Sequence, residues 1–60
     1  MKTTTADNYT ALRQRLGAAS TAEALAKLEA SATRIYNAGQ LSVSEFRWLD
    51  VAIMEKLARL

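Results

Sequence analysis

The sequence predicts an all-α fold in which a short N-terminal helix, about residues 6–16, packs on an antiparallel hairpin of two longer helices, about 21–38 and 43–59. Apolar residues recur at spacings of three and four along the chain, as one side of an α-helix requires. No segment shows the apolar–polar alternation of a half-buried strand. Gly39 and Ser42 then place a helix stop and a helix start close together, which predicts the hairpin.

The size of the chain limits what the fold can bury. Its 60 residues predict one small domain, residues 1–60, near the size at which a single core supplies only modest stability. Half of the residues are apolar, but the chain has no cysteine and no histidine, so disulfides and Cys/His zinc sites are excluded as supports. Oligomerisation is the support left to so short a chain.

The first helix has a recognisable start and an expected end. Thr4 or Thr5 can cap it, and Asp7 places a negative charge in the first turn, where it complements the helix dipole. Gly17 is expected to end the helix, and residues 1–5 are expected to fray. A helix of this length does not persist alone in water, so it must dock on the rest. The apolar residues that share its inner side are Tyr9, Leu12 and Leu16.

A capping box is predicted at the start of the second helix. Ser20 is expected as the N-cap and Glu23 as the residue that reaches back to its amide. Glu23 and Lys27 are also spaced as a favourable i, i+4 ion pair. The positions expected to face inward are Leu25, Leu28, Ala32 and Ile35.

The turn between the two long helices carries the strongest local signals in the chain. Gly39 can take a positive φ and suits the residue just past a helix C-terminus. Ser42 and Glu45 predict a second capping box, and Leu41 and Phe46 are placed to touch as a hydrophobic staple. These five residues are therefore assigned structural roles.

The third helix carries two apolar stripes. The stripe expected to face inward comprises Phe46, Leu49, Ile53, Leu57 and Leu60. The second stripe, on an adjoining side, comprises Trp48, Val51, Met54 and Ala58. Together the stripes cover more of the helix than one partner helix can bury, so apolar surface is expected to remain exposed.

Residues 34–57 combine an apolar-aromatic helix end, Ala38-Gly39, an apolar residue, a serine, Glu45-Phe46, and a helix that ends in paired aliphatic residues. This pattern resembles that of the short C-terminal domain (SHOCT) family. The resemblance implies a small helical hairpin that mediates oligomerisation or partner contacts. The short, alanine-rich chain with its polar start also resembles small accessory proteins of bacteria and their phages.

DNA binding by a helix-turn-helix regulator is the alternative function. The net charge of +2 comes from interleaved signs, which is typical of an ordinary solvated surface. The segment from Val43 to Trp48 would open the recognition helix, yet it carries an acid and bulky apolar groups where base contacts need Arg, Lys, Asn or Gln. The sequence therefore argues against nucleic acid as a partner. Its candidate phosphate contacts would be Arg13, Arg15 and Arg34.

Catalysis, cofactors and membranes are not predicted. Without histidine or cysteine the candidate bases are carboxylates, and Asp50 and Glu55 diverge on a helix. No acidic loop of alternating oxygen ligands exists for a hard cation, so we expect no metal and no cofactor. The N-terminus lacks the apolar run of a signal peptide and no segment approaches the roughly 20 apolar residues of a membrane span, which predicts a cytoplasmic protein.

Trp48 has two interpretations that the sequence leaves open. It either fills the core against the first helix or belongs to an interface, where Trp, Tyr, Met and Arg are enriched. The interface residues predicted on the second interpretation are Tyr36, Arg47, Trp48, Val51, Met54 and Ala58. We expect a non-enzymatic protein–protein interaction module that forms a homodimer and binds or modulates a larger bacterial or phage-host protein.

Overall fold

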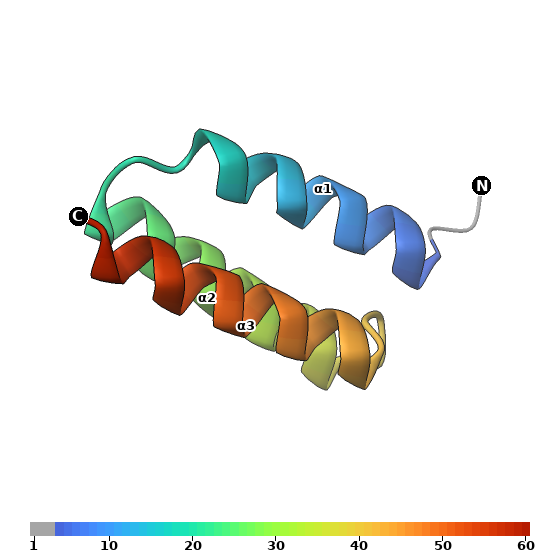
Figure 1. The fold of residues 1–60 in the computed structure, drawn as a ribbon. Coiled ribbons are helices and arrows are strands. Elements are labelled where there is room, and N and C mark those ends of the chain that lie inside the picture. Colours follow the sequence, from blue (N-terminus) through green and yellow to red (C-terminus); the bar gives the residue numbers. More distant parts are fainter. Residues whose placement is uncertain (1–3) are drawn as a thin grey trace.

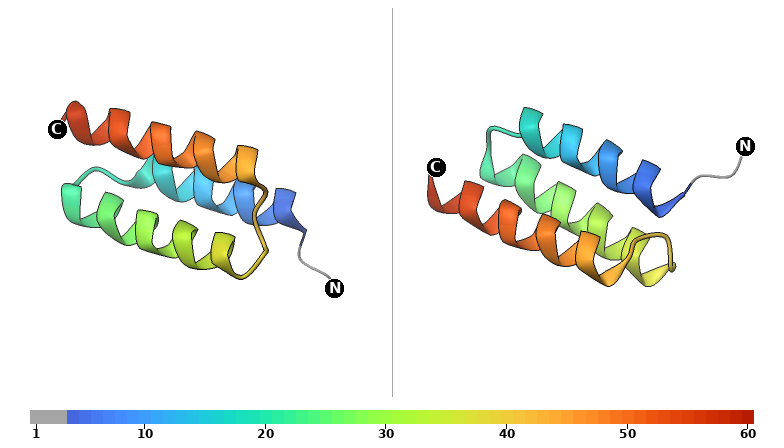
Figure 2. Two further views of the ribbon diagram at one scale, coloured as in Figure 1. Left: turned by 90° about the horizontal axis from the view of Figure 1, so that it is seen from below. Right: turned by 45° about the vertical axis from the view of Figure 1, so that its right-hand side comes forward.

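The computed structural model describes residues 4–60, which form three helices: α1 (Thr5–Ala18), α2 (Ala22–Asn37) and α3 (Val43–Ala58). The long helices α2 and α3 lie side by side and antiparallel, and α1 packs against both (Figures 1 and 2). No strand occurs within residues 4–60. The predicted all-α fold, a helix on a helical hairpin, is confirmed.

One apolar core joins the three helices. Its fully buried side chains come from the predicted inner sides of all three: Leu12, Leu25, Leu28, Leu49 and Ile53. Ile35, Phe46 and Leu57 are half-buried and pack around this core. Leu60 was expected to face inward but is 61% exposed, because α3 ends at Ala58 and Leu60 follows its cap.

A capping box opens α1. The Thr4 hydroxyl accepts a hydrogen bond from the Asp7 amide at 3.1 Å, and the Asp7 carboxylate accepts one from the Thr4 amide at 3.3 Å. Each residue thus satisfies an amide that the helix leaves free. Of the segment expected to fray, Thr4 and Thr5 form the start of α1, and residues 1–3 lie outside the described residues.

The predicted end of the first helix at Gly17 is wrong. Gly17 lies inside α1, which continues to Ala18 with Ala19 as its C-cap. The Lys56 ammonium of α3 donates hydrogen bonds to the carbonyls of Leu16 at 2.6 Å and Gly17 at 3.3 Å. A side chain from 40 residues away therefore satisfies the carbonyls that a left-handed glycine would otherwise serve.

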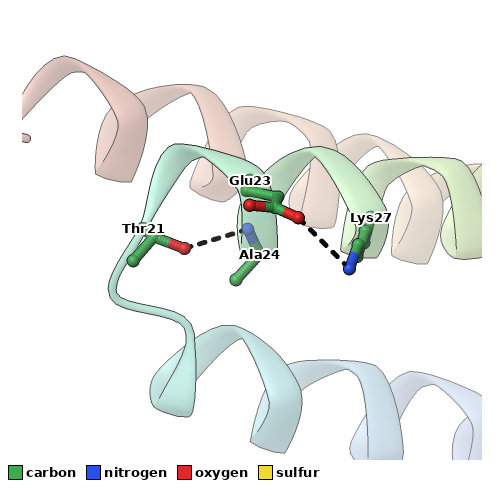
Figure 3. A network of polar contacts seen from close by, with 4 residues as sticks. All are labelled: Thr21, Glu23, Ala24 and Lys27. Atoms are coloured by element: carbon green, nitrogen blue, oxygen red, sulfur yellow. Dashed lines mark hydrogen bonds and ion pairs between the residues drawn. The ribbon is translucent and has the colours of Figure 1, made fainter.

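The predicted capping box of Ser20 and Glu23 is also wrong. The N-cap of α2 is Thr21, whose hydroxyl accepts from the Ala24 amide at 3.1 Å (Figure 3). Because α1 runs longer than expected and Ala19 is buried, the start of α2 falls one residue later. Glu23 therefore sits one position too early for the box and instead pairs with Lys27 at 3.4 Å, as its spacing predicts.

The turn between α2 and α3 forms as its local signals predict. Gly39 has a φ of 77°, and the amides of Gly39 and Gln40 donate to the carbonyls of Tyr36 at 2.9 Å and Ile35 at 3.0 Å, a Schellman motif. Ser42 and Glu45 then exchange the hydrogen bonds of a capping box. The two residues of the predicted staple both join the core: Leu41 is buried and Phe46 packs against it.

The two glycines predict opposite effects of the same substitution. Gly39→Ala is expected to destabilise the fold by about 1 kcal/mol, because alanine is strained at positive φ. Gly17→Ala is expected to stabilise it by about 0.5–1 kcal/mol, because Gly17 is helical and an added Cβ meets nothing within 4 Å. Urea unfolding followed by circular dichroism measures both. A loss of stability in Gly17→Ala would show that α1 needs its glycine.

Candidate interaction surface on α3

One side of α3 is apolar and turned away from the core. Val43, Val51 and Met54 are 57%, 55% and 61% exposed. At 3.6 residues per turn, these residues and two more exposed neighbours fall within an arc of about 80°. We call this stripe the outer face of α3; it comprises Val43, Arg47, Val51, Met54 and Ala58.

Trp48 borders the outer face; its side chain packs partly against α1 and is partly exposed, so it has features of both interpretations. Its ring packs edge-to-face on Tyr9 of α1, with centroids 5.8 Å apart, and the Arg13 guanidinium lies 5.2 Å from its ring centroid. The side chain nevertheless remains 47% exposed. Trp48 therefore fastens α1 to α3 and still presents apolar surface beside the outer face.

Tyr36, also predicted for the interface, lies in a different environment. Its half-buried ring stacks on Phe46 with centroids 4.4 Å apart and planes within 11°. Tyr36 is in the last turn of α2 and Phe46 in the first turn of α3, so the tight turn between the helices brings the rings together. Tyr36 and Trp48 therefore belong to two separate aromatic pairs, Tyr36 with Phe46 and Trp48 with Tyr9.

Sequence reasoning missed three residues of this region. Val43 extends the outer face by one turn, and its spacing of four from Arg47 and eight from Val51 was a signal that could have found it. Tyr9 and Arg13, which flank Trp48, come from another helix. No spacing within α3 could have indicated them.

Charges on and beside the outer face have no ion-pair partner within the part of the chain that the structure describes. The one ion pair of residues 4–60 joins Lys27 and Glu23 on α2. Arg47, in line with the apolar residues, and Glu55, beside them, are both exposed. These two charges are available to a second molecule.

A shallow depression of about 290 Å³ lies where α1 meets the start of α2. Its lining combines two basic side chains with a mostly alanine floor, and it contains no carboxylate that could act as a general base. The lining residues are Arg15, Ala18, Ala19, Ala24, Lys27 and Leu28. The depression therefore presents the basic side chains of Arg15 and Lys27 beside an apolar floor.

Residues 4–60 bring together no group of three acidic, histidine or cysteine side chains that could hold a metal ion. None of their helices has both the length and the hydropathy to cross a bilayer. Comparison with protein-family models, curated proteins and solved structures gives no match to any of them. The resemblance of residues 34–57 to the SHOCT hairpin stays a prediction.

Proposed function

We propose that this protein is a non-enzymatic helical interaction module that self-associates through the outer face of α3 and binds a larger bacterial or phage-host protein in the cytoplasm. The observation that carries the proposal is the outer face itself. It holds three large apolar side chains that are each more than half exposed, on a chain whose core is already complete.

Contact between the outer face and a partner would remove apolar surface from water. Removing apolar surface from water contributes about 25 cal/mol per Å². A contiguous apolar stripe bordered by charges is typical of an interaction site rather than of a solvated helix. Met54 and Arg47 on the stripe, and Trp48 beside it, belong to the residue types enriched in interfaces.

The size of the molecule sets the expected strength of self-association. The chain exposes 4279 Å², so a standard interface of about 800 Å² per partner would cover about a fifth of it. A helix of 16 residues is only about 24 Å long, so one helix face covers less than that area. We therefore expect a reversible dimer with a dissociation constant of about micromolar.

A DNA-binding regulator remains the competing class of function, and the surface favours it less. The first two turns of α3 expose Val43, whose side chain has no hydrogen-bonding group, and Trp48, whose single indole N–H can donate only one hydrogen bond to a phosphate or base edge. Arg13, a candidate phosphate contact, lies over the rings of Tyr9 and Trp48.

Salt dependence separates the two classes. We expect the self-association constant to change by less than about threefold between low and high salt, and a DNA duplex to show no binding even at low salt. Analytical ultracentrifugation measures the first and fluorescence anisotropy of a labelled duplex the second. Tight duplex binding that falls steeply with salt would replace the proposed function with DNA binding.

A further inference from the structure

We infer that two copies of this chain pair α3 against α3 in antiparallel orientation, with Arg47 of each copy packed over Ala58 of the other. The inference rests on the proposed function, because it takes the outer face as the contact surface. Beyond the proposed function, it specifies that the partner on this surface is a second copy of the chain. It also specifies the register in which the two copies meet.

The spacing of four of the five residues of the outer face is the same in both directions along the helix. Residues 47, 51, 54 and 58 are separated by four, three and four positions. A two-fold axis between positions 51 and 54 therefore places Val51 opposite Met54 of the other copy, and Arg47 opposite Ala58. Each of these four residues then faces another of the four, as a self-complementary two-fold interface requires.

The side-chain sizes fit the same register. Ala58 is small and exposed, so it leaves room for the aliphatic stem of Arg47, which covers apolar surface while its charged end stays in water. Val51 and Met54 meet at the centre, where both are more than half exposed in the single chain. The largest decrease in exposed apolar surface on pairing therefore occurs at the two-fold axis.

Charge complementarity selects the antiparallel orientation over the parallel one. A parallel pair in register would place Arg47 directly against Arg47 of the other copy. In the antiparallel pair Arg47 lies about three residues, or ~4.5 Å, along the axis from Glu55 of the other copy, within reach of its long side chain. Neither charge has an ion-pair partner among residues 4–60 of its own chain.

The other helices leave this approach open. α1 and α2 both pack against α3 on its core side, through Leu49 and Ile53. The two views of Figure 2 show α3 at an edge of the bundle, with one flank uncovered along its length.

Cysteine cross-linking tests the register, because the natural chain contains no cysteine. Two variants, Arg47→Cys and Ala58→Cys, are oxidised separately and as an equal mixture. Helices packed 8–10 Å apart bring directly facing Cα atoms within the roughly 7 Å that a disulfide can bridge. Both positions are exposed, so both variants should fold, which circular dichroism checks.

The antiparallel register predicts a covalent dimer in the mixture at about ten times the yield of either variant alone, since like positions lie ~16 Å apart along the axis. Ala30→Cys, on the exposed outer side of α2, gives the background rate of random collision. If either variant alone gave as much covalent dimer as the mixture, like positions would face each other, and the inference would be overturned in favour of a parallel pair. A mixture that does not exceed the Ala30→Cys background would overturn it as well.

The same samples distinguish failure of the register from failure of the proposed function. The molar mass of the unmodified protein is measured by sedimentation at the concentration used for cross-linking. A dimer mass with the wrong cross-links rejects the antiparallel register alone, whereas a monomer mass rejects self-association and the register together.

Discussion

Val51→Lys is expected to abolish self-association while the fold stays intact. In the proposed dimer the substitution places two ammonium groups near the two-fold axis, where each loses water and the two like charges repel each other. We expect self-association to weaken by about a hundredfold or more, or ~3 kcal/mol. Because Val51 is 55% exposed in the single chain, its thermal stability should change by no more than about 0.5 kcal/mol. Sedimentation and circular dichroism measure the two effects.

Ala30→Lys is the matched control for this substitution. It adds the same charge to the same fold, but on the exposed outer side of α2. Its self-association should equal that of the unmodified protein. If Val51→Lys and Ala30→Lys associate equally well, the outer face of α3 is not the contact surface.

Leu49→Ala is expected to cause the largest loss of stability. The Leu49 side chain is 0% exposed and lies at the centre of the core shared by the three helices. Such a truncation costs about 2–5 kcal/mol, while a domain of 60 residues has a total stability of about 3–9 kcal/mol. The variant should therefore melt at a much lower temperature, with a substantial unfolded fraction at room temperature.

Met54→Ala provides the comparison within the same helix. Met54 is 61% exposed, so its truncation should alter the free energy of unfolding by no more than about 0.5 kcal/mol. Urea unfolding of both variants gives the difference directly. Comparable losses from Leu49→Ala and Met54→Ala would mean that α3 does not bury Leu49 while leaving Met54 exposed.

The parts of the fold that could be predicted from the sequence are those specified by near neighbours. Gly39 and the Ser42–Glu45 box act through hydrogen bonds that span a few residues, so their spacing alone indicated the turn. The inner side of α2 followed from the helical period, and Leu25 and Leu28 are buried as expected.

The errors arose where contacts between helices replace local signals. Gly17 has the identity of a helix stop, but Lys56 of α3 supplies hydrogen bonds that let α1 continue. Ser20 and Thr21 are adjacent residues that can both cap; in the structure Thr21 is the N-cap of α2, and Ala19 before them is buried. No local pattern contains that information.

For the candidate surface as well, features set within one helix could be predicted, whereas features set by contacts between helices could not. The period of α3 predicted that Val51, Met54 and Ala58 would lie together away from the core, and all three are exposed on one side. The stacking of Tyr36 on Phe46 could not be predicted from either helix alone, because the turn that joins the two helices brings the rings together. Trp48 could not be assigned from α3 alone, since Tyr9 of α1 covers part of its ring.

The molar mass of the purified protein by light scattering, over about a hundredfold range of concentration, tests the central claim most directly. Self-association through the outer face of α3 predicts a mass that rises with concentration from 6.6 kDa toward twice that value. It also predicts that Val51→Lys removes the rise. A mass that stays at 6.6 kDa throughout, with a cooperative thermal melt, would contradict the claim and leave the outer face free for a different partner.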